Sequence, residues 1–254
     1  MRPFIDTSSI VRRIWGDPDV ILLIFAGGAA EFALNKAVDW LFFTNRLPKD
    51  PIARLFSTVS YAQKIVFASE QDAHDTLARI NAVHSAVERA RGQSIPDWAH
   101  RDVLYMLIDY SQRAYELLHG PLTSGEEDDL YEGFLRVGRG LNVERLPVTF
   151  SEWRTDRERH LKRDLVYSAF TRRLFEQYRK HLGWWRYQLL LDLQALLVPV
   201  HVRELLRLSA KPMLVSSGVN LYALIARTWL QEPARRMLIP RQYWHQVHGL
   251  SAPT

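Results

Sequence analysis

The sequence predicts an all-α fold, organised as a single multi-helix domain over residues 1–254. Apolar residues recur at helical rather than alternating spacing along nearly the whole chain. Hairpin signals such as Asn-Gly or Asp-Gly between β-branched runs are missing. A chain of 254 residues can also bury a substantial core and enclose a ligand. We place the core of the domain at about residues 17–208, followed by C-terminal helices and a tail over residues 209–254.

The N-terminal part contains the most apolar stretch of the chain, from Val20 to Phe43. Charged residues, among them Glu31 and Asp39, interrupt this stretch and argue against a transmembrane span. Gly27-Gly28 lies inside the helical pattern, where two glycines permit close helix packing or a kink. We therefore expect no transmembrane span in this part.

Two helices with clear boundaries follow. Asp50-Pro51 supplies an N-cap and a proline at the first helical position, and it predicts a helix to about Ala68. Ser69 can cap the next helix, which we expect to run to Gly92. These two helices carry most of the candidate site residues.

The later helices are also delimited by local signals. Start signals are Asp97, Thr123/Ser124 and residues 149–152, the last of which have the Ser/Thr-x-x-Glu form of a reciprocal capping box. Stop signals are Gly120-Pro121, Gly140, Pro199 and Pro212.

Composition excludes several function classes. The chain has no cysteine, so it has no disulfide, no thiolate nucleophile and no cysteine-ligated metal or c-type haem. The net charge of +5 is spread along the chain, and the Arg-rich run over residues 154–164 alternates with acidic residues, which we interpret as a solvated helix face. We therefore expect no nucleic-acid partner. The absence of a signal-peptide pattern at the N-terminus is consistent with a cytoplasmic protein.

His84 is the first candidate site residue. It shares an apolar line with Leu77, Ile80 and Val87 on the predicted helix over residues 70–91, and its imidazole should therefore point inward. A buried imidazole needs a partner, which can be a structural hydrogen bond, a catalytic neighbour or a metal. Taken alone, the structural hydrogen bond is the ordinary explanation.

Arg54 and Thr58 form a second candidate pair. They lie one turn apart at the edge of the apolar face of the helix from Pro51, in a line with Tyr61 and Ile65. Such a guanidinium and hydroxyl can bind an anion, a haem propionate or an iron-bound oxygen species. The alternative is a surface arginine whose stem covers the core, with the threonine bonded to the preceding turn.

Asp109 is the third candidate. The surrounding run over residues 103–110 is apolar enough to predict burial, and a buried carboxylate requires a partner or a raised pKa. Asp109 could pair with an arginine, orient an imidazole or act as an acid or base.

These residues lie in segments that resemble the rubber-oxygenase (latex-clearing protein) and MpaB-type oxygenase family, over roughly residues 17–208. The segments are DPIARLFST (50–58), VHSAV (83–87), LPVT (146–149), LLVP (196–199) and VRE (202–204). Their order and spacing, more than any single segment, carry the resemblance.

The resemblance implies an all-α fold that encloses a pocket for haem b, with His84 as the axial ligand of the iron. It places Arg54 and Thr58 on the oxygen-facing side or at the haem edge. Asp109 is a further candidate catalytic residue on the ground of its predicted burial and not of the resemblance. The implied reaction is oxygenation of an apolar small molecule by dioxygen or a peroxide, such as oxidative cleavage of a C=C bond.

Two departures from the family pattern motivate an alternative. Ser57 stands where rubber oxygenases have a lysine, and residues 107–109 (LID) stand where many members have Trp-Val-His. We find no match for the distal glutamate. The alternative is a haem-free or catalytically lapsed protein of the same fold that binds lipid or another protein. A further alternative is peripheral binding to membranes or nucleic acid through the Arg-rich faces.

Overall fold

The computed structural model describes residues 2–43, 50–209 and 240–245. The all-α prediction is confirmed, because the regular structure of these residues is helical apart from two isolated bridges, Pro3 to Ser69 and Asn35 to Leu165. Pro212 and most of the expected C-terminal tail lie outside the described residues. None of the described helices has the length and hydropathy needed to cross a membrane.

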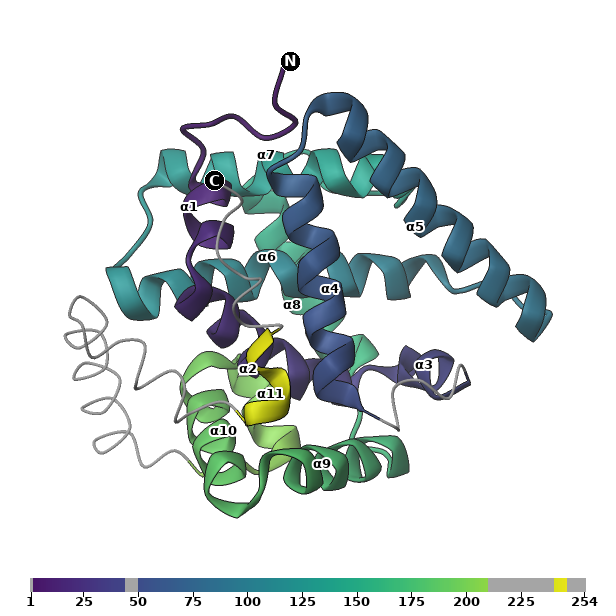
Figure 1. Ribbon diagram of the computed structural model, residues 1–254, viewed down its shortest axis with the longest axis vertical. Helices are drawn as coiled ribbons and strands as arrows, with labels where there is room; N and C mark the ends of the chain where they lie inside the picture. Colours follow the sequence, from purple (N-terminus) through teal and green to yellow (C-terminus); the bar gives the residue numbers. More distant parts are fainter. Residues whose placement is uncertain (1, 44–49, 210–239, 246–254) are drawn as a thin grey trace.

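Figure 1 shows the arrangement of the helices. In chain order they are α1 (Ile10–Gly16), α2 (Pro18–Leu34), the short 3-10 helix η1 (Lys36–Val38), α3 (Asp39–Phe43), α4 (Pro51–Val66), α5 (Glu70–Arg91), α6 (Asp97–His119), α7 (Ser124–Gly140), α8 (Phe150–Asp164), α9 (Ala169–Leu182), α10 (Trp184–Leu197), α11 (Val200–Leu206) and η2 (Arg241–Tyr243).

Helix α2 forms the centre of the core. Thirteen of its 17 residues are buried, so it has no solvent-facing stripe and packs on several sides. It crosses α6 at Gly27, where a Cβ atom would lie only 2.3 Å from Cδ1 of Tyr110. The close helix packing expected from Gly27-Gly28 is confirmed at Gly27, since only a glycine lets the Tyr110 ring approach so near.

Most predicted helix boundaries are confirmed. Asp50 accepts a hydrogen bond from the backbone N–H of Ala53 at 2.9 Å, and Ser69 accepts one from Asp72 at 3.3 Å. Gly92 ends α5 in the left-handed conformation, with φ of 69°.

One capping prediction was wrong in detail. At α8, Thr149 accepts from the N–H of Glu152, but the Glu152 carboxylate accepts from Val148 rather than from Thr149. The reciprocal box forms instead at α7, between Thr123 and Glu126.

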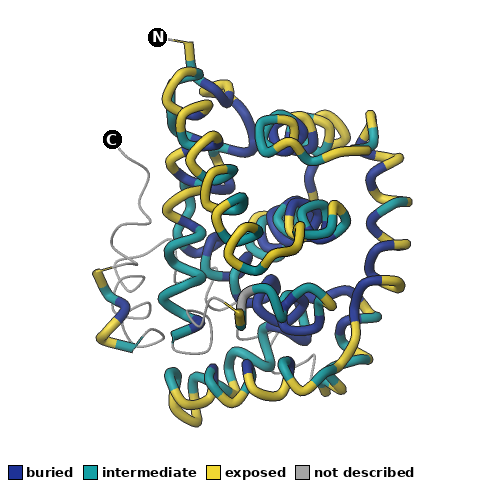
Figure 2. The backbone as a smooth tube through the Cα atoms, turned by 90° about the vertical axis from the view of Figure 1, so that its right-hand side faces the viewer, coloured by how far each residue is buried: buried dark blue, intermediate teal, exposed yellow. Residues whose placement is uncertain are grey.

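Helix α5 lies at the edge of the molecule and is held near its two ends. Its buried residues, Ala73 and Leu77, belong to the N-terminal third, where Leu77 packs on Gly140 of α7. At the other end Arg91 binds Asp39 of α3 at 2.6 Å and lies over the Trp40 ring. Figure 2, viewed from the side on which α5 lies, shows exposed and intermediate residues along its turns. The middle of α5 therefore spans from α7 to α3 without a buried residue of its own.

Candidate functional site

His84 lies in the middle part of α5, on the same helix face as Leu77. The face is as predicted, but His84 is half-buried rather than enclosed, because no residue of α5 beyond Leu77 is buried. Its ring contacts that of His100 on α6, with a distance of 4.9 Å between ring centroids and an interplanar angle of 47°. Within the described part of the chain, neither ring nitrogen of His84 has a hydrogen-bond partner. A structural hydrogen bond thus does not account for this histidine.

The surroundings of His84 favour its neutral form. Partial burial lowers its pKa to about 4, and the neighbouring His100 and Arg54 act in the same direction, whereas Glu88 opposes them. Burial also lowers the pKa of His100. At neutral pH His84 therefore carries no charge and retains the nitrogen lone pair that metal ligation requires.

Arg54 and Thr58 lie one turn apart on α4, and Arg54 acts electrostatically on His84. Arg54 Nη1 donates to Ser57 Oγ at 3.2 Å, and Ser57 Oγ donates to the Arg54 carbonyl at 2.8 Å. Thr58 Oγ1 donates to the same carbonyl at 3.2 Å, as the alternative reading of this threonine expected. Both Arg54 and Thr58 are half-buried. The structure brings Arg54 within electrostatic range of His84, while the Thr58 hydroxyl proton is engaged in its own helix.

Arg91 provides a second positive charge on the His84 face of α5. It lies seven residues after His84, which is close to two helical turns and about 10 Å along the axis. Besides its bond to Asp39, its guanidinium stacks on the Trp40 ring at 3.9 Å. Its Nη1 atom is nevertheless buried and lacks a hydrogen-bond partner among the described residues. A buried unpaired N–H donor of this kind is uncommon and marks a place where an anion could bind.

Asp109 lies elsewhere on α6. It is buried as predicted, and its carboxylate accepts from Arg157 of α8 at 3.0 and 3.1 Å and from Arg113 at 2.5 Å. Arg157 also binds Glu31 of α2 through both of its terminal nitrogens, at 2.6 and 2.5 Å. Nine residues, about 14 Å of helix, separate Asp109 from His100. The structure therefore does not bring Asp109 together with His84, and of its three expected roles it shows the arginine pair.

The Arg157 contacts correct the interpretation of α8 as a solvated face. Arg157 and Asp164 are each only 4% exposed. Arg157 can be buried because two carboxylates compensate its charge, and burial raises the pKa of Glu31 while Arg157 opposes that effect. The interpretation was wrong for these two residues because it considered only charges within the helix.

Sequence reasoning missed two groups of polar residues. His100 was not singled out, although it packs on His84. The second group, Asp102 with His160 and Asp164, is fully buried between α6 and α8. A signal for it exists, because Asp156, His160 and Asp164 follow one another at four-residue spacing and so share one face of α8.

Comparison with known families identifies the family of the chain. The family model described as "ER-bound oxygenase mpaB/B'/Rubber oxygenase, catalytic domain" matches residues 12–238. The chain belongs to this family. The match includes all of the helices that carry His84, His100, Arg54 and Asp109. No curated protein and no solved structure gives a significant match.

Membership in the mpaB/rubber oxygenase family settles the general class of the protein. The matched region is an oxygenase catalytic domain, and dioxygen and an organic substrate are the reactants that this class uses. The match also extends about 30 residues beyond the region in which the sequence segments resemble the family, to residue 238. Residues 210–238 of that match lie outside the described residues.

Proposed function

We propose that this protein is a haem b-dependent oxygenase in which His84 is the axial ligand of the iron. The observation that carries the proposal is the state of His84. Its imidazole is neutral, half-buried and without a hydrogen-bond partner, on a helix face that the described residues leave partly uncovered. An iron ion bound to a ring nitrogen of His84 would supply the partner that the imidazole lacks.

The surrounding residues fit the two chemical parts of haem. The macrocycle is flat and apolar, and the half-buried Ile80 and Val87 flank His84 on the same face of α5. The two propionates are anions, and two arginines could receive them. Arg54 of α4 lies within electrostatic range of His84, and Arg91 lies about two helical turns from His84, over the Trp40 ring. The unpaired Nη1 atom of Arg91 is a suitable donor for a carboxylate.

The chain's own residues would bind, orient and shield the reactants. When bound, haem b supplies the oxygen chemistry through its iron. His84 holds the group in place, and the His100 ring that packs on it restricts its orientation. Arg54 contributes positive charge near the reacting atoms, and the Thr58 oxygen keeps lone pairs that can accept a hydrogen bond.

Asp109 has a different proposed role. Its carboxylate is saturated by Arg157 and Arg113, so it holds α6 against α8 and α2 rather than exchanging protons with a substrate. Catalysis by Asp109 stays a prediction from sequence that its surroundings do not favour.

We propose an apolar small molecule as the substrate and dioxygen or a peroxide as the oxidant. The proposal rests on family membership and on the partly uncovered apolar face around His84. Cleavage of a C=C bond, or a related oxygenation, is the reaction class that this combination suggests.

The absorption spectrum of the purified protein, produced with ample haem, tests the proposal. We expect an intense Soret band with about one haem per chain, and we expect His84→Ala to abolish it. The matched control is His74→Ala, which removes an exposed histidine from the same helix. Circular dichroism verifies that each variant is folded.

Two outcomes would contradict haem ligation by His84. One is a colourless wild-type protein, and the other is a Soret band that survives unchanged in His84→Ala. A colourless, folded protein that instead binds apolar probes would support the haem-free lipid-binding alternative.

A further inference from the structure

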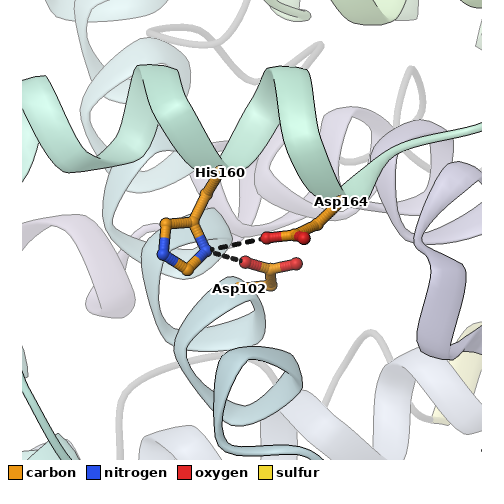
Figure 3. A group of neighbouring side chains, drawn as sticks. All are labelled: Asp102, His160 and Asp164. Carbon is orange, nitrogen blue, oxygen red and sulfur yellow. Dashed lines mark hydrogen bonds and ion pairs between the residues drawn. The ribbon is translucent and has the colours of Figure 1, made fainter.

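Three buried side chains on α6 and α8 converge on one another (Figure 3). Asp102 comes from α6, and His160 and Asp164 come from α8. The Nδ1 atom of His160 lies 3.1 Å from Asp164 Oδ2 and in hydrogen-bond contact with Asp102 Oδ1. One ligand atom from each residue lies within 4.8 Å of the other two, and the three side chains are 3–6% exposed.

Contacts beside Nε2, the other ring nitrogen of His160, favour one orientation of the ring. Asp156 Oδ2 lies 3.6 Å from Nε2 of His160, and the Tyr105 hydroxyl donates to that same oxygen at 2.8 Å. Metal-bound histidines usually have a carboxylate beside the ring nitrogen that does not bind the metal, because it fixes the tautomer and the ring plane. With a proton on Nε2, the Nδ1 lone pair of His160 points between the two aspartates.

The charges in the cluster are only partly balanced by its neighbours. Asp102, Asp156 and Asp164 surround one imidazole. Arg163 binds Asp164 through Nε at 2.8 Å and through Nη2 at 2.6 Å, and the same Nη2 lies 3.3 Å from His160 Nδ1. Arg159 binds Asp156 at 3.2 Å. The Arg163 and Arg159 side chains are 57% and 70% exposed, so either guanidinium can move out into solvent. Asp102 has the Asn35 amide, a neutral donor, at 2.7 Å as its other partner. A positive charge between two buried carboxylates that share one ring nitrogen stabilises them, and a metal ion could take the place that Arg163 Nη2 now holds.

We propose that Asp102, His160 and Asp164 form a binding site for one divalent first-row transition-metal ion, such as Zn²⁺, separate from the haem. One imidazole nitrogen and two carboxylates suit these ions, whereas Mg²⁺ and Ca²⁺ favour oxygen ligands alone. With metal–ligand distances of about 2.0–2.2 Å, ligand atoms lie about 3–3.5 Å apart. Small side-chain rotations would bring the present atoms to those separations, and water would complete the coordination.

The position of the proposed metal site between α6 and α8 indicates a structural role for the ion. Asp102 follows His100 by two residues, so the two side chains leave α6 about 200° apart. The ion therefore lies on the far side of α6 from His84 and links α6 to the C-terminal turn of α8. Asn35, at the end of α2, contacts the same aspartate. This is a structural clamp on three helices that needs no haem to form.

Isothermal titration of the 254-residue protein, first stripped with a chelator, tests the site, and thermal unfolding with and without the ion accompanies it. Zn²⁺ is the probe, and Mg²⁺ and Ca²⁺ are the comparison ions. We expect one Zn²⁺ per chain, a rise in the unfolding midpoint, and binding at least tenfold tighter than that of Mg²⁺ or Ca²⁺. His160→Gln and Asp164→Asn should each weaken Zn²⁺ binding by tenfold or more.

The matched control is His119→Gln, which removes a surface histidine paired with Asp17 at 3.0 Å and should leave Zn²⁺ binding unchanged. Circular dichroism monitors folding, and Asp164→Asn decides the question if His160→Gln does not fold. Failure of the wild type to bind Zn²⁺, or unchanged binding in a folded cluster variant, would overturn the proposal. Either result is independent of the Soret band, so it leaves the haem assignment untouched.

Discussion

The two sides of helix α6 satisfy their polar groups in opposite ways. On the side of α5, His84 and His100 are half-buried, and their pKa values are lowered by burial without a carboxylate on the ring nitrogens. On the side of α2 and α8, Arg157 and Asp109 are fully buried and saturated with charged partners. The difference teaches that the α2 and α8 side is built to hold the fold together, including through the proposed metal clamp, whereas the α5 side retains polar groups that can bind a ligand of the reaction.

Breaking the Arg157 network should produce the largest loss of stability. Arg157→Met leaves Glu31 without its charged partner in the core, and removing one member of a buried ion pair costs about 3–5 kcal/mol. Denaturant unfolding measures this cost. The control, Arg159→Met, removes an arginine that is 70% exposed and should change stability by less than about 0.5 kcal/mol. Similar losses in both variants would contradict the assignment of stability to the buried side.

Packing on the same side gives the next largest effect. Gly27→Ala would place a Cβ atom 2.3 Å from the Tyr110 ring, which must shift or push α2 away. Overpacking of this kind costs about 1–3 kcal/mol, measured by thermal or denaturant unfolding. Gly125→Ala on α7, where the new Cβ meets nothing within 4 Å, should be neutral or slightly stabilising. Equal stability of the two variants would show that the contact between α2 and α6 is not tight.

An exposed ion pair should give the smallest effect and a distinct pH dependence. Backbone and side-chain hydrogen bonds from Thr123, together with Arg13, lower the pKa of Glu126 to about 2. A lowered carboxyl pKa stabilises the fold above the ordinary pKa near 4.5, and this contribution is lost as the pH falls toward 2. Glu126→Gln should therefore cost about 0.5–1 kcal/mol at pH 7 and almost nothing near pH 2.

Unfolding curves of Glu126→Gln and the wild type across this pH range provide the measurement. A difference between the two proteins that stays constant with pH would contradict the role of the carboxylate charge.

The sequence allowed the helices to be predicted because their boundaries depend on local chemistry. Ser69 and Asp50 accept hydrogen bonds from residues three positions later, so the signal and its partner lie in one short segment. The face of α5 that carries His84 and the burial of Asp109 could likewise be predicted from helical spacing. These are properties of a single helix.

The partners of these residues could not be predicted in the same way. Glu31 lies 126 residues from Arg157 in the sequence, and Asp102 lies 58 residues from His160. Without those partners, Arg157 resembles any surface arginine of a charged helix. The half-burial of His84 also depends on how far α5 extends beyond the core, which is set by its contacts with α7 and α3. Pairings of this kind follow from the tertiary fold and not from local spacing.

The attachment of α5 near its ends has a consequence for cooperativity. The free energy that keeps a helix from opening locally comes mainly from the apolar area it buries, and between Leu77 and Arg91 this helix buries no residue completely. We expect its middle turns to open more readily than α2, which is buried along most of its length. The turns around His84 thus form a unit of low local stability within a rigid scaffold, and a group bound there would raise the stability of those turns by its own binding free energy.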